Sequence, residues 1–271
     1  MKLRNCYLFT LILVVFNQII QAQNKVQFQT KPSWSDEFNV SGLPDAKKWG
    51  YDVGGDGWGN NEKQYYTKDR LENARVENGK LIIEVRKEDY QGSAYTSARL
   101  VTKNKADFLY GKIEMKAKLP SGRGTWPALW MLASQQSYGE AFWPHNGEID
   151  IMEHVGYDQG TVVSTVHTKA FNHTIGTQKS GKVFSEKVST EFQIYTLEWS
   201  PQKMEMFMNG KSIFTFDNSN QSWEQWPFDK KFHLLFNIAV GGNWGGQKGI
   251  DETIFPQRME VDYVRYYALK K

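Results

Sequence analysis

Alternation of apolar and charged residues is the clearest pattern in the chain. From Lys112 to Leu119 every even position is charged and every odd position is apolar. Such alternation indicates a strand with one buried face, because successive side chains of a strand point to opposite faces. Met204–Met208 and Lys211–Phe216 flank Asn209-Gly210, a pair that suits the two positive-φ positions of a type I′ turn. This second segment therefore predicts a β-hairpin.

Further strands are predicted along the rest of the chain. The candidates are Leu81–Arg86, Ala98–Thr102, Val162–His167, Phe192–Trp199, Phe232–Val240 and Met259–Tyr267. Beyond the N-terminus no segment carries a sustained helical stripe, and Pro44–Trp49 and Glu224–Phe228 are expected to form single helical turns at most. Many strands with Gly-rich connections predict an all-β sandwich or barrel.

The N-terminus has the three parts of a secretory signal peptide. Lys2 and Arg4 precede the apolar run Tyr7–Phe16, and Ala22 follows as a small residue for cleavage. An uncleaved membrane anchor is the alternative, but ten apolar residues are too few to cross about 30 Å of hydrocarbon. We therefore predict a cleaved signal peptide at residues 1–22 and a single catalytic domain at residues 23–271. The product is expected to be secreted, extracellular or periplasmic, and free of the membrane.

Charge and cysteine content argue against several kinds of partner and site. The formal net charge is +3, which gives no electrostatic reason to expect nucleic acid as a partner. The single cysteine, Cys6, lies in the predicted leader. The mature chain therefore has no disulfide, thiolate metal site or cysteine nucleophile. We expect it to be a monomer.

Three carboxylates lie within six residues, at Glu148, Asp150 and Glu153. On a regular strand Glu148 and Asp150 would share one face, and Glu153 would point to the buried side. One extra residue near Ile151-Met152, a β-bulge, would return Glu153 to the face of the other two. We therefore predict a bulged strand with all three carboxylates on one side.

Like charges on one face suit acid/base catalysis. Their mutual field can keep one carboxyl protonated near neutral pH while another stays ionised. A solvated acidic face is the simplest alternative, and a divalent-metal site is the second. His145 and His154 lie nearby, but the segment has no HExxH or comparable ligand spacing, so metal-assisted hydrolysis is disfavoured.

Tryptophans point to a sugar substrate. The chain has 10 Trp, and Trp126, Trp130 and Trp244 lie among Gly, Pro and Asn residues, where exposure is expected. A flat indole can stack on the apolar face of a pyranose while amides and carboxylates bind its hydroxyls. Trp49 and Trp199 are instead expected in the core. A concave sheet lined in this way would suit a polysaccharide.

Several motifs together resemble glycoside hydrolase family 16, in its laminarinase (endo-β-1,3-glucanase) branch. The Glu148–Glu153 segment resembles the bulged form of that family's active-site signature, with two residues between Asp and the second Glu. The other matching segments are Trp34–Phe38, Trp58–Glu62, Tyr95–Arg99, Gly124–Met131, Asn237–Trp244 and Val261–Arg265. The resemblance thus extends over nearly the whole predicted mature chain.

The resemblance implies a β-jelly-roll sandwich of two antiparallel sheets with a concave substrate cleft. It also implies hydrolysis with retention of anomeric configuration. Glu148 matches the nucleophile, Glu153 the general acid and base, and Asp150 a carboxyl that assists Glu148. Retention requires the two working carboxyls to lie about 5–5.5 Å apart.

The same resemblance implies binding residues. The positions that match residues lining the glycone subsites are Asn60, Arg99, Trp126, Trp130 and Trp143. Trp244 belongs to a loop at the cleft, and His167 matches a cleft histidine near the second Glu, with a satisfied core histidine as its alternative. No cofactor is implied for catalysis. A structural calcium on the convex side is implied at Glu37, Gly79 and Asp262, partly through backbone carbonyls, because oxygen donors suit calcium.

Three functions remain open from the sequence. The first is a secreted endo-β-1,3-glucanase acting on laminarin-type glucans, and also on mixed-linkage β-1,3-1,4-glucans. The second is a β-glucan recognition protein on the same fold, although such relatives have typically lost the carboxylates that this chain retains. The third is a hydrolase of a galactan such as agarose or carrageenan. The Trp58–Glu62 and Gly124–Met131 segments favour glucan by resemblance.

Overall fold

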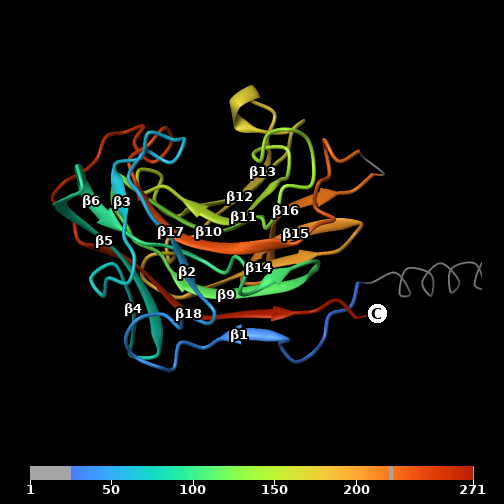
Figure 1. The fold of residues 1–271 in the computed structure, drawn as a ribbon, viewed down its shortest axis with the longest axis horizontal. Coiled ribbons are helices and arrows are strands. Elements are labelled where there is room, and N and C mark those ends of the chain that lie inside the picture. The colour runs from blue at the N-terminus through green and yellow to red at the C-terminus, as the bar shows by residue number, and fades with distance from the viewer. Residues whose placement is uncertain (1–25, 220–221, 271) are drawn as a thin grey trace, which may run out of the picture.

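The computed structural model describes residues 26–219 and 222–270, and it folds into two stacked β-sheets (Figure 1). The predicted signal peptide at residues 1–22 lies outside the described residues. Within the described part of the chain, no helix has both the length and the apolar character needed to cross a membrane. A single 3₁₀ helix, η1 (His173–Ile175), is the helical content of those residues.

The first sheet has ten strands in the order β16-β15-β14-β9-β18-β5-β6-β3, with β1 beside β18 and β4 beside β5. Its strands are β1 (Trp34–Asp36), β3 (Gln64–Tyr66), β4 (Ala74–Glu77), β5 (Lys80–Tyr90), β6 (Ser93–Ser97), β9 (Gly111–Lys118), β14 (Gln193–Trp199), β15 (Lys203–Met208), β16 (Lys211–Asp217) and β18 (Gln257–Tyr267). We refer to it as the outer sheet.

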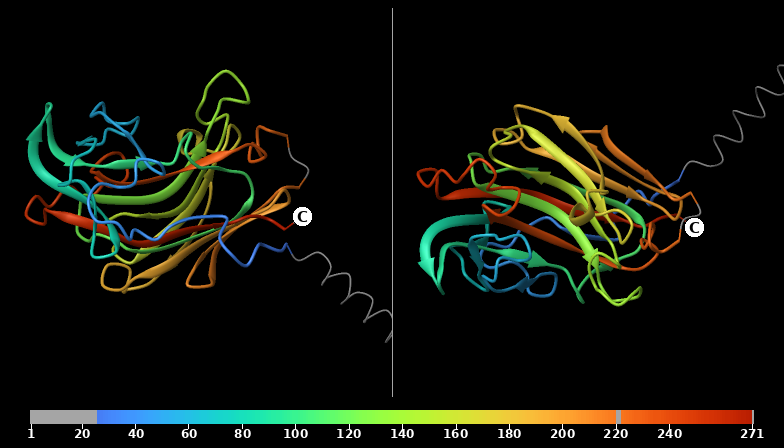
Figure 2. Two further views of the ribbon diagram at one scale, coloured as in Figure 1. Left: turned by 60° about the horizontal axis from the view of Figure 1, so that its bottom comes forward. Right: turned by 90° about the horizontal axis from the view of Figure 1, so that it is seen from above.

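The second sheet has eight strands in the order β13-β12-β11-β10-β17-β7-β2, with β8 beside β17. Its strands are β2 (Gly50–Asp52), β7 (Arg99–Val101), β8 (Asp107–Phe108), β10 (Thr125–Ala133), β11 (Glu148–His154), β12 (Thr161–His167), β13 (Lys179–Phe184) and β17 (Phe232–Val240). We refer to it as the inner sheet. Figure 2 shows that the long strands of the sandwich are strongly bent.

The strand predictions are confirmed. Burial alternates residue by residue along β9, as the charge pattern of that segment requires. β15 and β16 form the expected hairpin, and Asn209 and Gly210 between them have φ angles of 51° and 76°. The six further candidates correspond to β5, β7, β12, β14, β17 and β18. Pro44–Trp49 and Glu224–Phe228 contain hydrogen-bonded turns and no helix.

One strand pair departs from the antiparallel expectation. β3 pairs with β6 in parallel, with Tyr65 opposite Thr96. β4 and β5 separate these strands in the chain, so no hairpin joins them and the connection does not impose an antiparallel direction. The other strand pairs that the structure describes are antiparallel.

The core lies between the two sheets. Every residue of β17 is buried, and the inward side chains of β9 and β10 are at most 1% exposed. Burying one large apolar side chain contributes about 1.5–3 kcal/mol, so this layer holds both sheets firmly. Trp49 and Trp199 belong to it, as expected. The side chains on the opposite face of the inner sheet point away from this core.

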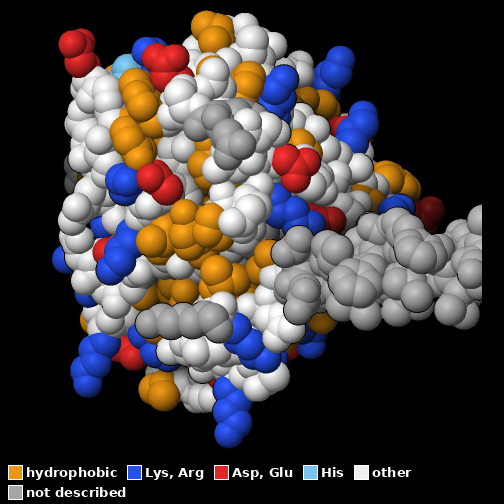
Figure 3. All heavy atoms as spheres, turned by 90° about the vertical axis from the view of Figure 1, so that its right-hand side faces the viewer, with side chains coloured by type: hydrophobic (Ala, Val, Ile, Leu, Met, Phe, Trp, Pro, Cys, Tyr) orange, Lys and Arg blue, Asp and Glu red, His pale blue; other side chains and the backbone are white. Residues whose placement is uncertain are grey.

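The surface mixes charges of both signs. Figure 3 shows the side of the molecule near the C-terminus, where Lys and Arg side chains alternate with Asp and Glu side chains around an apolar patch. This arrangement agrees with the near-neutral formal charge of +3. On that face basic and acidic side chains are interspersed.

Candidate active site

The strand that carries the three carboxylates contains the predicted bulge. In the pairing of β11 with β12, Asp150 lies opposite Thr165, whereas Glu153 lies opposite Val163. Three residue steps on β11 therefore correspond to two on β12, so β11 has one extra residue. The bulge that we expected near Ile151-Met152 is confirmed.

The bulge is stabilised from the neighbouring strand. Ser164 Oγ donates a hydrogen bond of 2.7 Å to the carbonyl oxygen of Ile151, which lies in the extra step. Ile151 and Met152 are both fully buried, so two consecutive side chains enter the core where a regular strand would send one. Glu153 is thereby returned to the face of Glu148, and both line the same cavities.

Two adjoining cavities cover this face of the inner sheet. The first, of about 420 Å³, is lined by Asp150 and by the predicted binding residues Arg99, Trp130 and Trp143. The second, of about 460 Å³, is lined by His167 and Trp244. Both cavities share Asn60, Trp126, Glu148, Glu153 and His173. The structure thus gathers all seven predicted binding residues and all three carboxylates around one continuous groove.

Two tryptophans bind the carboxylates directly. Trp126 Nε1 donates to Glu153 Oε1 at 3.0 Å, and Trp143 Nε1 donates to Glu148 Oε2 at 2.8 Å. The sequence suggested only a stacking role for these indoles. The structure adds a second role, because each N–H fixes the orientation of one carboxylate and favours its charged form.

Burial raises the pKa of each of the three carboxyls. For Glu153 burial, reinforced by the charge of Glu148 and opposed by the Trp126 hydrogen bond, raises the pKa to about 8. For Glu148 burial raises the pKa to about 7, against hydrogen bonds from Trp143 and Asp150 and the charge of Arg99. Burial and both neighbouring glutamates raise the pKa of Asp150 well above its usual range. The Trp143 and Asp150 hydrogen bonds and the Arg99 charge favour the ionised form of Glu148, whereas the charge of Glu148 favours the protonated form of Glu153.

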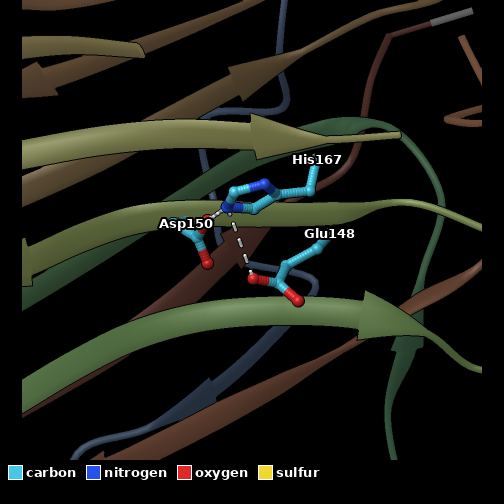
Figure 4. Close-up of side chains that lie close together, drawn as sticks. All are labelled: Glu148, Asp150 and His167. Carbon is cyan, nitrogen blue, oxygen red and sulfur yellow. Dashed lines mark ion pairs between the residues drawn. The ribbon is translucent and has the colours of Figure 1, made fainter. Parts of the chain in front are cut away.

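His167 lies beside the first glutamate. It is directly opposite Glu148 in the β11–β12 register, and its Nε2 is 3.4 Å from Asp150 Oδ2 and 3.8 Å from Glu148 Oε1 (Figure 4). We expected this side chain near the second glutamate; its closest carboxylates are those of Asp150 and Glu148. Burial and the nearby His173 lower the pKa of His167 to about 4, so the ring is neutral at neutral pH.

Arg99 is held between two indoles. Its guanidinium carbon lies 4.7 Å from the ring centroids of both Trp58 and Trp130, within the range of cation–π attraction. Its Nε is 3.0 Å from Asp52 Oδ2. The guanidinium thus fixes the two aromatic walls of the first cavity.

A buried network behind Trp130 was not anticipated. Trp130 Nε1 donates to Asn237 Oδ1 at 2.7 Å, and Asn237 Nδ2 donates to the Tyr66 hydroxyl at 2.9 Å. That hydroxyl donates in turn to Glu62 Oε2 at 3.3 Å, and Asn60 donates to Glu62 Oε1 at 3.4 Å. Glu62 and Asn237 both lie in motifs that carried the family resemblance, and this was the signal that could have identified them.

His173 had no comparable signal. It belongs to η1, in the loop that follows β12, and it reaches both cavities from outside the matched motifs. Its ring packs against Trp143 and His167, with centroids at 5.1 and 5.2 Å. Figure 1 shows this helix above the inner sheet, in yellow.

The three positions implied for calcium lie on or beside strands β1, β5 and β18 of the outer sheet. One edge of β18 pairs with β9, and the other pairs first with β5, up to Val261, and then with β1, from Val264. Glu37 directly follows β1, Gly79 directly precedes β5 and Asp262 lies on β18 between these two pairings, so the register brings the three positions to the same stretch of β18. The Glu37 carboxylate binds Arg265 at 2.8 and 3.0 Å, and that of Asp262 binds Lys116 at 2.7 Å. The calcium stays a prediction.

Comparison with known proteins agrees with this geometry. Residues 61–265 match the model of Glycosyl hydrolases family 16. A curated Beta-glucanase of Rhodothermus marinus is 56% identical over 239 residues, which cover 86% of this chain and 84% of that protein. The X-ray structure of the laminarinase from Rhodothermus marinus superposes with a TM-score of 0.89 at 53% identity, over 91% of this chain and 99% of that one.

A second solved structure that resembles this chain is that of a ligand complex. It is a mutant of SCLam, a non-specific endo-β-1,3(4)-glucanase co-crystallised with 1,3-β-D-cellotriosyl-glucose. It has a TM-score of 0.83 and 46% identity, and the match covers 90% of this chain and 98% of that chain. With the bulged carboxylate strand in its groove and these matches along its length, the protein belongs to glycosyl hydrolase family 16.

Proposed function

We propose that this protein is a retaining endo-β-1,3-glucanase that hydrolyses laminarin-type glucans, and mixed-linkage β-1,3-1,4-glucans as well, by double displacement. The observation that carries this proposal is the bulge in β11, which places Glu148 and Glu153 on one face at the junction of the two cavities. The substrate follows the relatives, which are a β-glucanase, a laminarinase and an endo-β-1,3(4)-glucanase.

The groove supports attack within a chain. The carboxylates lie where the two cavities meet, so sugar units can occupy either side of the bond that is cut. Trp58, Trp130 and Trp143 line one side, and Trp244 lines the other, which provides apolar faces for pyranose rings in both directions. An enzyme that acted only on chain ends would need one of these sides closed.

The first chemical step uses the two glutamates in different states. Ionised Glu148 attacks the anomeric carbon and forms a glycosyl ester, while protonated Glu153 donates its proton to the departing glycosidic oxygen. The hydrogen bond from Trp143 to Glu148 Oε2 holds the nucleophile in place and stabilises its charge. The higher pKa of Glu153, about 8, keeps its proton available near neutral pH.

The second step reverses the proton transfer. Glu153, now ionised, removes a proton from water, and the resulting oxygen nucleophile attacks the anomeric carbon and releases Glu148. The hydrogen bond from Trp126 stabilises the Glu153 carboxylate during this interval. Two inversions at the same carbon give net retention.

Asp150 tunes the nucleophile. It is 2% exposed and hydrogen-bonded to Glu148, and its own pKa is raised, so it holds a proton that it shares with that neighbour. Such a proton reduces repulsion between the two carboxyls and supports the charge of Glu148 before attack. Its role is therefore to assist the nucleophile.

Substrate profiling tests the function against its alternatives. Laminarin, curdlan, lichenan and agarose would be incubated with the enzyme, and the products would be separated by size and linkage. We expect oligosaccharides of several lengths from laminarin early in the reaction, and cleavage of lichenan as well. Binding of laminarin without products would favour the recognition protein, and cleavage of agarose alone would favour the galactan hydrolase. Early ¹H NMR spectra should show the β-anomer first, because the configuration is retained.

The remaining expectations are part of the proposal. We propose that residues 1–22 direct secretion, that residues 23–271 form one catalytic domain, and that the secreted product is a monomer. N-terminal sequencing of the exported product should begin at Gln23. Light scattering on the purified enzyme should give the mass of one chain.

We also propose that Glu37, Gly79 and Asp262 hold a structural calcium. Thermal unfolding of chelator-treated protein would be followed with and without added CaCl₂. Calcium should raise Tm, because an ion that binds only the folded state stabilises it. An unchanged Tm at millimolar calcium would contradict the site.

A further inference from the structure

Three potential metal ligands from two strands meet inside the groove. Glu148, Asp150 and His167 each offer one ligand atom, and these atoms lie within 4.8 Å of one another. Nε2 of His167 approaches Oδ2 of Asp150 and Oε1 of Glu148. Figure 4 shows the imidazole directed at both carboxylates. In the described ranges this is the group of three such side chains that could surround one ion.

The pairing of β11 with β12 sets the positions of these three side chains in the absence of a ligand. Glu148 and His167 are directly opposite each other in an antiparallel pair, where Cβ atoms lie about 4.5–5.5 Å apart. Asp150 is two positions along the same strand and therefore points to the same face. All three side chains thus project from two neighbouring strands of the inner sheet, β11 and β12.

The spacing suits a tetrahedral ion. Zinc binds imidazole nitrogen and carboxylate oxygen at about 2.0–2.2 Å, which places neighbouring ligands of a tetrahedron about 3.3–3.6 Å apart. Nε2 of His167 is 3.4 Å from Asp150 Oδ2 and 3.8 Å from Glu148 Oε1. These two distances are within about 0.5 Å of the tetrahedral spacing, and the ligand atoms of Glu148 and Asp150 lie within 4.8 Å of each other.

One of the ligand atoms is buried and has no hydrogen-bond partner among the described residues. The Asp150 side chain is 3% exposed, and its Oδ2 forms no hydrogen bond within the described part of the chain. Trp143 binds the other oxygen of Glu148, Oε2, and so orients Oε1 toward the imidazole. A hydrogen bond of this kind from a second layer of residues is what commonly aligns metal ligands.

We propose that Glu148, Asp150 and His167 bind Zn²⁺ at this position and that the ion inhibits the enzyme by competing with substrate. Zinc displaces the proton held by Asp150, so that two carboxylates balance the charge of the ion. One nitrogen with two oxygens is a donor set that zinc accepts. Calcium takes six to eight oxygen ligands and magnesium demands octahedral geometry, so neither fits three atoms that include an imidazole nitrogen. Bound zinc occupies Glu148, the proposed nucleophile, and blocks its approach to the anomeric carbon.

Calorimetry on the full chain tests the site without any sugar. ZnCl₂ titrated into the enzyme should give one site per chain, and MgCl₂ should give no comparable heat. His167→Gln should weaken zinc binding at least about tenfold, because it removes one of three ligands. His173→Gln is the matched control: this histidine lines the same cavity and lies outside the group, so the variant should keep the wild-type affinity.

Equal affinities in His167→Gln and the wild type would overturn the proposal, as would an equal loss in both histidine variants. Asp150→Asn provides a second test if His167→Gln does not fold. This variant keeps the size of the side chain and replaces a carboxylate oxygen, so its zinc affinity should also fall about tenfold or more. Wild-type affinity in folded Asp150→Asn would contradict the site.

Kinetics separate this proposal from the proposed function. Zinc should raise the apparent KM for laminarin without lowering kcat, and a chelator should restore activity. A purely noncompetitive pattern would contradict binding at the nucleophile. Because zinc binding is measured in the absence of sugar, its failure would leave the glucanase proposal untouched. Conversely, a protein that proved inactive on every glucan could still bind zinc.

Discussion

The carboxylates of the two sheets have different partners. On the outer sheet Glu84 binds Arg75 and Arg86, and Glu260 binds Lys118 and Arg258. On the inner sheet the glutamates of β11 face indole N–H groups and a neutral imidazole. Among the described side chains, no lysine or arginine forms an ion pair with Glu148, Asp150 or Glu153.

The pKa values follow this difference. The Arg70 guanidinium beside Glu88 holds the pKa of that carboxyl below its usual range, and Arg265 does the same for Glu37. Burial without such a cation raises the pKa of Glu153 to about 8. A carboxylate paired with arginine stays ionised and stabilises the fold, whereas a buried and unpaired one can exchange protons with a substrate.

Removal of the proposed nucleophile, Glu148, should have the largest effect. Glu148→Ala is expected to lower kcat on laminarin by about 10⁴-fold or more, because no other group can form the glycosyl ester. Azide should restore part of the cleavage, because it fits the space left by the side chain and attacks the anomeric carbon directly. The product should be a glycosyl azide of inverted configuration, identified by ¹H NMR.

Glu88→Ala on the outer sheet is the matched control for that variant. It removes an arginine-paired carboxylate and should leave kcat unchanged. If Glu148→Ala kept ordinary activity, or if both variants lost activity equally, the contrast between the two sheets would have no catalytic meaning.

Replacement of the proposed general acid, Glu153, should have the next largest effect. Glu153→Gln is expected to lower kcat/KM for laminarin by about 10²–10⁴-fold, because the leaving oxygen then receives no proton. The phenolate of an activated aryl β-glucoside can leave without being protonated. The first step on such substrates should therefore be much less affected. Equal losses on both substrates would count against an acid role for Glu153.

The pH profile should reveal both glutamates. kcat/KM should fall below about pH 7, where Glu148 takes up a proton, and above about pH 8, where Glu153 loses its own. Trp126→Phe removes a hydrogen bond that favours the charged form of Glu153, so the alkaline limb should move to higher pH by less than about one unit.

Trp143→Phe provides the matching variant for the acid limb. It removes the corresponding hydrogen bond to Glu148, so the acid limb should also move upward. The two substitutions must act on different limbs. A shift of the same limb in both variants would refute the assignment of the two glutamates.

The smallest effect is expected on the free energy of unfolding. The change should have opposite signs for a glutamate of the inner sheet and one of the outer sheet. The pKa of Glu153 in the folded state, about 8, exceeds its ordinary value of 4.5, so its ionisation costs stability as the pH rises through this range. Near pH 8 Glu153→Gln should therefore raise the free energy of unfolding by about 1 kcal/mol or more. Glu88→Gln should lower it by about 0.5–1 kcal/mol, because a lowered pKa contributes stability above pH 4.5.

Denaturant unfolding at pH 5 and pH 8 measures both variants. The gain for Glu153→Gln should shrink toward pH 5, where the wild-type carboxyl is already protonated in the folded state. The loss for Glu88→Gln should be present at both pH values, because that carboxyl stays ionised. A loss of stability in Glu153→Gln at pH 8 would contradict an unpaired buried acid.

Local patterns were sufficient for much of the fold. The alternation in Lys112–Leu119 determined which face of β9 is buried, because side-chain direction along a strand depends only on neighbouring residues. Asn209-Gly210 determined the β15–β16 turn in the same way, through backbone conformation. The bulge could be predicted because Ile151-Met152 has one apolar residue too many for a regular strand.

Contacts between distant segments required the tertiary structure. Trp130 bonds to Asn237 across 107 positions, and this contact depends on β10 and β17 being neighbours in the sheet. The parallel pairing of β3 with β6 and the place of His167 beside Glu148 likewise depend on strand order and register. The sequence by itself predicted the residues that line the groove and the buried face of β9. Only the folded sheets decided which of those residues are in contact, because a short local pattern does not specify which strand it pairs with.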